Sequence, residues 1–126
     1  MNTSRLPDAE LEIMKIIWRY DGEVTSAQIV QALAGKRDWA VTTVLNFLAR
    51  LVEREFISVR RNGKSNIYKC IVKENDYLKS ESKSFLERLH GNSLTGLIAS
   101  LYDGKAISRN DLEELQHFIN TRSDEQ

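Results

Sequence analysis

The chain of 126 residues contains one cysteine, one proline, two histidines and no long apolar run. Cys70 cannot form a disulfide within one chain, although a dimer could bring two copies together, and it has no Cys or His neighbour at metal-ligand spacing. No segment approaches the ~20 apolar residues of a membrane span, and the N-terminus lacks a signal-peptide pattern. We therefore expect a cytoplasmic protein without a membrane segment, metal site or cofactor.

Motifs typical of enzyme active sites are also missing. The sequence contains no nucleophile–base pair, phosphate-binding loop or paired acid/base motif, so an enzyme is the remotest of the function classes. The eighteen basic and eighteen acidic residues cancel in total but are unevenly placed. Residues 1–73 carry twelve Lys or Arg and eight Asp or Glu, whereas residues 74–126 carry six and ten. Only the first part, with its positive surplus, suits a polyanion such as nucleic acid.

Two helices are predicted in the first 35 residues. Apolar residues at helical spacing predict a helix over residues 8–20, namely Leu11, Met14, Ile17 and Trp18. Thr25 is followed three residues later by Gln28, which is the capping-box spacing at the start of a helix. Val24 is expected in a short strand before this helix, and Gly35 is expected to end it in a left-handed conformation.

A third helix is predicted over the segment AVTTVLNFLARLVEREF, with Asp38 as its N-cap. Its apolar residues form one stripe: Val41, Val44, Leu45, Leu48, Leu51 and Val52. Its opposite side carries mostly polar residues: Thr42, Thr43, Asn46, Ala49, Arg50 and Glu53. Since every surface helix has a polar side, this face alone is equally consistent with simple exposure to solvent.

The composition of the first turn of this helix favours a function. Residues 41–44 are all β-branched, which costs on the order of 1–2 kcal/mol of helix propensity relative to alanine. Such a cost without a gain in stability indicates function. Threonine offers a hydroxyl for phosphate or base edges and a methyl group for thymine, Asn46 can pair with adenine, and Arg50 can reach guanine or phosphate.

A β-hairpin is predicted directly after the third helix. Residues 56–60 and 66–72 are rich in strand formers, and Asn62-Gly63 between them is a strong hairpin-turn signal. The predicted tip is basic, with Arg60, Arg61 and Lys64. Basic residues on edge strands also protect against aggregation, so a purely protective role of these three residues stays open as the alternative to DNA contact. As a wing, the hairpin would contact the phosphate backbone beside the groove that the helix enters.

Three short amphipathic helices are predicted after residue 73, with Ser93 and Ser108 as N-caps of the last two. Their apolar residues are Tyr77, Leu78, Phe85, Leu86 and Leu89; then Leu94, Leu97, Ile98 and Leu101; then Leu112, Leu115, Phe118 and Ile119. Roughly fifty residues are few for an autonomous core, so burial against a second copy is favoured over packing on the first domain. A two-fold dimer would hold its DNA-contacting helices ~34–36 Å apart, or a multiple of this, and bind a palindrome.

The segments WAVTTVLNFLARLVEREFI and VRRNGKSNIYKC resemble the winged-helix core of the penicillinase-repressor (BlaI/MecI/CopY-type) family of bacterial transcriptional regulators. LPDAELEIMKIIW, FLERLHGNSLTGLIASLYD and ISRNDLEELQHFI extend the resemblance over nearly the whole chain. The predicted fold is mainly α with a small β-hairpin wing: a winged helix-turn-helix domain (1–73) and a C-terminal helical dimerisation domain (74–126). The resemblance implies a homodimeric repressor of an operator with inverted half-sites.

The resemblance also assigns residues and partners. Thr42, Thr43, Asn46 and Arg50 match base-reading positions, with Asn46 in place of the expected threonine, while Arg60, Arg61 and Lys64 fall in the wing and Trp39 anchors the helix. The penicillinase and methicillin-resistance members are induced through a sensor protease that cleaves an Asn-Phe bond. The corresponding pair here is Ser100-Leu101, so the Asn-Phe cleavage sequence is not retained. The expected partners are therefore operator DNA, a second copy of the chain, and a sensor protease or another inducing partner. A single cysteine also excludes the C-terminal cysteine cluster of copper-responsive relatives.

Overall fold

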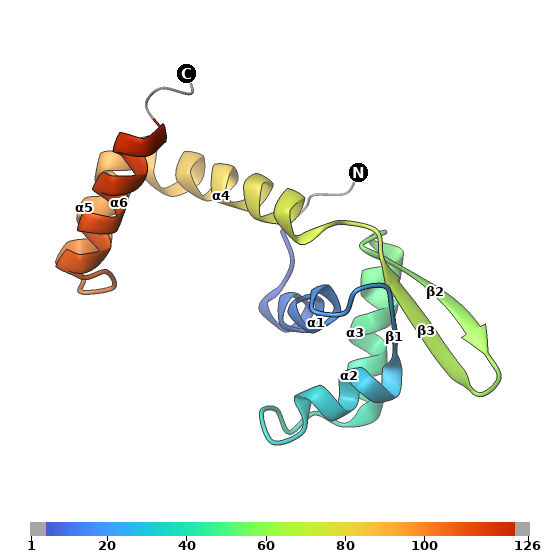
Figure 1. The fold of residues 1–126 in the computed structure, drawn as a ribbon. Helices are drawn as coiled ribbons and strands as arrows, with labels where there is room; N and C mark the ends of the chain where they lie inside the picture. Colours follow the sequence, from blue (N-terminus) through green and yellow to red (C-terminus); the bar gives the residue numbers. More distant parts are fainter. Residues whose placement is uncertain (1–4, 123–126) are drawn as a thin grey trace. The chain divides into compact units, whose positions relative to one another are not determined.

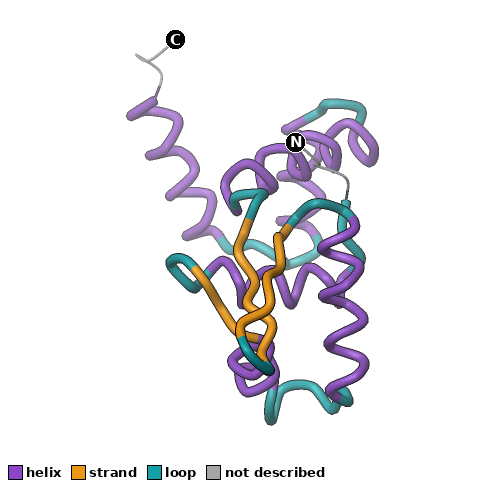
Figure 2. The backbone as a smooth tube through the Cα atoms, turned by 90° about the vertical axis from the view of Figure 1, so that its right-hand side faces the viewer, coloured by secondary structure: helices purple, strands orange, loops and turns teal. Residues whose placement is uncertain are grey.

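The computed structural model describes residues 5–122, which form six helices and three strands (Figure 1). In chain order these are α1 (Asp8–Trp18), β1 (Glu23–Thr25), α2 (Ser26–Leu33), α3 (Val41–Glu53), β2 (Ile57–Asn62), β3 (Ser65–Cys70), α4 (Glu74–His90), α5 (Leu94–Asp103) and α6 (Arg109–Arg122). Helices dominate and the strands form a small sheet, as Figure 2 shows. The predicted class, mainly α with a small β-hairpin, is confirmed.

The chain divides into two compact units, one up to Glu81 and one from Ser82 onward. The division lies inside α4, whereas the sequence predicted domains over residues 1–73 and 74–126. The difference arises because residues 74–81 of α4 belong to the first unit, where the Tyr77 side chain is buried among core residues.

The core of the first unit lies between the three helices α1 to α3 and one face of the sheet. Its fully buried members include Ile13, Met14 and Ile17 of α1, Ile29 of α2, Val44, Leu48 and Leu51 of α3, and Val24 and Ile57 of the sheet. Each helix turns its predicted apolar stripe toward this core, but Leu11, Trp18, Val30, Leu45 and Val52 of these stripes are only partly buried, and Val41 at the start of α3 is exposed. The polar side of α3 faces away from this core.

The sheet is antiparallel in the order β1–β3–β2. Asn62 pairs with Ser65, so the two residues of the hairpin loop are Gly63 and Lys64. The turn lies one residue later than the predicted Asn62-Gly63. Gly63 takes the first loop position with a φ of +66°, whereas Lys64 at the second position is not among the residues with positive φ, which is the pattern of a type II′ hairpin.

Local signals at the start and end of α2 are confirmed. The backbone N–H of Gln28 donates to the Thr25 hydroxyl at 3.1 Å, and the Thr25 N–H donates to the Gln28 side chain at 2.9 Å. Gly35 after the helix has a φ of +80°, which is the left-handed conformation predicted for it. The strand expected at Val24 is β1.

The predicted N-cap of α3, Asp38, is wrong. The N-cap is Ala40, which makes no side-chain capping hydrogen bond, and Asp38 precedes the helix by three residues. Ala40 remains extended before the helix because the Trp39 ring beside it packs edge-on against Phe47, with 5.2 Å between centroids. Val41 therefore occupies the first helical position, 53% exposed, instead of joining the buried stripe.

The second unit contains the end of α4 with α5 and α6. Both predicted N-caps are confirmed, since Ser93 accepts a hydrogen bond from Gly96 N–H at 3.0 Å and Ser108 accepts one from Asp111 N–H at 3.1 Å. Among the described residues from Ser82 to Arg122, none is buried. The unit as a single copy thus leaves its apolar side chains in contact with water.

Candidate nucleic-acid interface

The exposed side of α3 carries the polar residues that the sequence predicted as base contacts. Thr42, Asn46 and Arg50 are exposed and follow one another at intervals of four residues, so they lie along one side of the helix. Thr43 is half-buried beside them, and Val41 adds an exposed apolar side chain at the helix start. We call α3 the recognition helix.

Two contacts fix the start of the recognition helix. Trp39 is half-buried against Phe47, so it anchors the helix start as the resemblance implied. The Arg37 guanidinium lies 5.4 Å from the centroid of the Trp39 ring and donates from Nε and Nη2 to the Glu12 carboxylate of α1, at 2.8 and 2.6 Å. The hydrogen bonds from Arg37 lower the pKa of Glu12. The turn before α3 is thereby connected to α1.

A buried carboxylate on α1 faces the other end of the recognition helix. Glu10 is only 1% exposed, and its Oε1 lies 3.4 Å from Nε of Arg54, the C-cap residue of α3. The pair meets the distance of an ion pair but not hydrogen-bond geometry, and Oε1 has no hydrogen-bond partner within residues 5–122. We treat the contact as an electrostatic one. Sequence periodicity could not reveal it, because an acidic residue in the first turn of a helix is normally exposed.

The three predicted wing residues are all exposed, but their side chains differ in the contacts that they make. Lys64 lies in the hairpin loop, and Arg61 donates from Nε to the backbone oxygen of Gly63 at 3.2 Å. Arg60 instead donates from Nε and Nη2 to the two carboxylate oxygens of Glu23 on β1, at 3.0 and 2.9 Å. Sequence analysis missed Glu23, because nothing local shows that β1 pairs with β3 beside the hairpin.

The predicted dimerisation residues lie on α5 and α6 and are half-buried or exposed. They are Leu94, Leu97, Ile98 and Leu101 on α5, and Leu112, Leu115, Phe118 and Ile119 on α6. Leu94, Ile98, Leu112, Leu115 and Ile119 line an apolar groove of about 420 Å³ between these helices. Phe118, 54% exposed, lies outside the lining of this groove.

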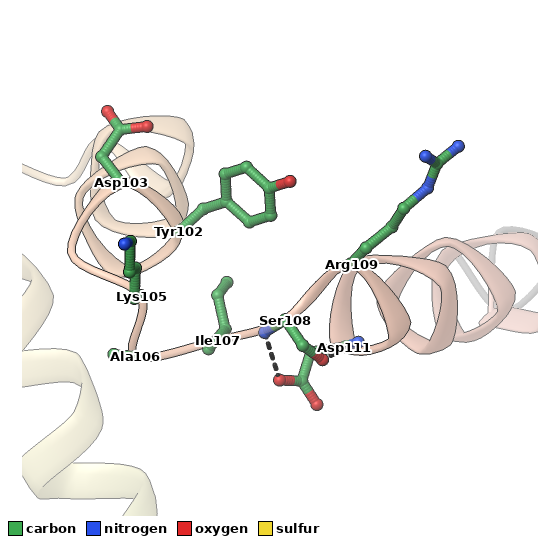
Figure 3. A pocket seen from close by; sticks show the side chains of 8 residues that line it. All are labelled: Tyr102, Asp103, Lys105, Ala106, Ile107, Ser108, Arg109 and Asp111. Carbon is green, nitrogen blue, oxygen red and sulfur yellow. Dashed lines mark hydrogen bonds between the residues drawn. The ribbon is translucent and has the colours of Figure 1, made fainter.

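A second hollow of about 620 Å³ lies at the turn from α5 to α6 (Figure 3). The Tyr102 and Ile107 side chains project into it, and the Ser108 N–H donates to the Asp111 carboxylate at 2.7 Å. Its charged residues are two acids and two bases, Asp103, Asp111, Lys105 and Arg109. Because the two acidic and two basic side chains balance, the lining favours neither an anionic nor a cationic ligand. The Asp111 carboxylate is also occupied already by the hydrogen bond from Ser108 at the start of α6.

Within residues 5–122, no helix combines the length and apolar character needed to cross a bilayer. The same part of the chain has no group of three or more His, Cys, Asp or Glu side chains arranged to hold a metal ion. Burial raises the pKa of the Cys70 thiol, which donates to the backbone oxygen of Val72. The thiol is thus kept in its less reactive protonated form.

Comparison with known proteins identifies the family. A family model described as penicillinase repressor matches residues 6–121. The penicillinase repressor of Bacillus licheniformis is 25% identical over 115 residues, which are 91% of this chain and 89% of the relative. The solution structure of the DNA-binding domain of the repressor BlaI aligns with a TM-score of 0.54 and 27% identity over 60% of this chain and 90% of that one. The monomeric form of Bacillus licheniformis BlaI in complex with the blaP half-operator aligns with a TM-score of 0.50, the same identity and the same coverage. The chain belongs to the penicillinase repressor family, which consists of transcriptional repressors and not of enzymes, and its first unit has the predicted winged-helix fold.

Proposed function

We propose that this protein represses transcription by binding a palindromic DNA operator as a homodimer. The observation that carries the proposal is the exposed line of Thr42, Asn46 and Arg50 on a helix whose other side is held in the core. A hairpin with exposed basic residues follows this helix directly. Among the relatives, Bacillus licheniformis BlaI in complex with a half-operator provides the precedent.

The recognition helix reads bases and the wing contacts phosphates. Thr42, Thr43, Asn46 and Arg50 have the donors, acceptors and methyl groups that discriminate base pairs in the major groove. The basic residues of the wing add attraction to the backbone that does not depend on sequence. A first domain with a surplus of positive charge is consistent with this division.

Burial argues for the dimer. A unit in which none of the described residues is buried gains little from folding alone, because apolar burial is the main favourable term in folding. The groove between α5 and α6 and the exposed Phe118 supply apolar surface for a second copy. In a two-fold interface, each such residue contributes twice. The second unit therefore serves dimerisation, and the first serves DNA binding.

The surface of the second unit also suggests where induction would act. Ser100-Leu101 lies in the last turn of α5, within the proposed dimer surface. A sensor protease or another inducing partner that separates α5 from α6 at this point would divide that surface. The operator would then lose the two-fold protein that matches its symmetry.

Selection of bound duplexes from random DNA by the purified full chain tests the proposal. We expect enrichment of an inverted repeat, a dimer by analytical ultracentrifugation, and an affinity that falls steeply as salt rises. A winged-helix module for protein contacts would instead bind DNA weakly and with little dependence on salt. Absence of any enriched sequence would contradict the proposed function.

A further inference from the structure

Arg60 and Arg61 are neighbours in β2, but they lie on opposite faces of the sheet, since side chains alternate along a strand. Arg61 shares its face with Ile57 and, across the register, with Val24 and Tyr68, all buried against the helices. The recognition helix buries its apolar stripe in this same core. Arg61 therefore lies on the core-facing side of the hairpin, at the end next to its loop.

Arg60 lies on the outer face of the sheet. Its backbone pairs with Ile67 of β3, and its side chain extends diagonally past β3 to Glu23 of β1. Both Glu23 carboxylate oxygens accept hydrogen bonds from the guanidinium, although the two side chains are 56% and 46% exposed. This two-point geometry distinguishes the pair from an ordinary surface ion pair.

The strand that carries Glu23 is itself well fixed. β1 consists of three residues and ends at Thr25, which is the N-cap of α2 and takes part in a complete capping box. The Arg60–Glu23 pair thus connects one edge strand of the sheet, which forms the wing, to a strand continuous with α2. In the sheet itself, β1 and β2 do not pair with each other, and each pairs with the middle strand β3.

We propose that Arg60 is a positioning residue that holds the wing through Glu23, and that the phosphate contacts of the wing come from Arg61 and Lys64. The inference rests on the proposed DNA binding, and it changes which basic residues make that contact. A guanidinium already bound by a carboxylate at two points supplies little net charge to a phosphate. Arg61, with a single bond to a backbone oxygen, keeps its charge for DNA.

Salt dependence of operator affinity separates a positioning residue from a phosphate contact. Each phosphate contact contributes ~0.9 to the slope of log affinity against log salt. We expect Arg60→Ala, Arg60→Lys and Glu23→Ala each to weaken binding about two- to fivefold with an unchanged slope. Lysine keeps the charge but lacks the planar fork, so it should not replace Arg60. Arg61→Ala is the matched control and should lower the slope by ~0.9.

Two further measurements make the test decisive. The charge reversal Glu23→Arg with Arg60→Glu should restore affinity, and amide hydrogen exchange in the DNA-free hairpin should rise in the single variants at Arg60 and Glu23 but not in Arg61→Ala. A lower slope in Arg60→Ala, wild-type binding by Arg60→Lys or tighter binding by Glu23→Ala would overturn the inference. Failure of the wild-type chain to bind any operator would instead overturn the proposed function.

Discussion

The Tyr77 hydroxyl accepts a hydrogen bond from the backbone N–H of Leu6 at 2.9 Å, in the buried interior of the first unit. The two residues come from the N-terminal segment and the first turn of α4. The bond satisfies a buried backbone donor that no helix or strand would satisfy. Leu6, which precedes α1, is thus part of the core of the first unit.

Tyr77→Phe should destabilise the first unit by about 1–3 kcal/mol, because it leaves the Leu6 N–H buried without an acceptor while keeping the aromatic ring. Chemical denaturation followed by tryptophan fluorescence measures this, since Trp18 and Trp39 both lie in the first unit. Tyr102→Phe, at a 43% exposed position in α5, is the control and should leave the transition unchanged. Equal effects of the two variants would contradict the importance of this bond.

Glu55→Gly should stabilise the first unit by about 0.5–1 kcal/mol. Glu55 follows the C-cap of α3 with a φ of +63°, a left-handed conformation that glycine adopts without strain. Glu53→Gly, two residues earlier and at the last position of α3, should instead destabilise by up to about 1 kcal/mol. Denaturation midpoints of the two variants provide the comparison, and a shift in the same direction would contradict the assignment of strain to residue 55.

Elements encoded by neighbouring residues could be predicted from the sequence. The capping box of Thr25 and Gln28 and the left-handed Gly35 depend on side chains within one turn, so their spacing was sufficient. The polar side of α3 was likewise predictable, because helical geometry assigns Thr42 and Asn46 to one side once the period is known.

Features that depend on distant contacts could not be predicted. The packing of Trp39 on Phe47 moves the start of α3 past Asp38 and exposes Val41, which its apolar character had assigned to the core. The Arg60–Glu23 pair requires the pairing of β1 with β3, which no local pattern specifies. The positioning role that we propose for Arg60 rests on this pair and therefore could not be predicted from the sequence.

Ile119→Glu should prevent dimerisation while the monomer remains folded, because Ile119 is already 49% exposed and lines the groove of the second unit. Burial of one such apolar side chain contributes about 1.5–3 kcal/mol to the free energy of association, and a two-fold interface loses this contribution twice. The variant dimer should therefore be at least ~100-fold weaker. Sedimentation velocity across protein concentrations measures the change. Gln116→Glu adds the same charge to the same helix outside the groove lining and should stay dimeric. Dimerisation of both variants would place the interface elsewhere.

The Glu12–Arg37 contact should stabilise the first unit at neutral pH and not in acid. Since hydrogen bonds from Arg37 lower the pKa of Glu12 in the folded state, the contribution is fully present above the unfolded pKa of about 4.3. It is lost as the pH falls through the folded-state pKa. The difference in free energy of unfolding between wild type and Glu12→Gln should therefore shrink as acid is added. In an Arg37→Gln background, the same comparison should show little dependence on pH in this range.

Base recognition by α3 and phosphate contact by the wing should separate in one binding experiment. Asn46→Ala should cost about 1–3 kcal/mol on the preferred operator and much less on other sequences, because it removes a base contact. Arg61→Ala combined with Lys64→Ala should weaken binding to all sequences and lower the salt slope by ~1.8 for two phosphates. Arg19→Ala, which removes an exposed charge at the end of α1, controls for net charge alone. Competition titrations with specific and random duplexes at several salt concentrations give both quantities. If the double variant altered sequence preference as much as Asn46→Ala, the wing would have to contribute to base recognition itself.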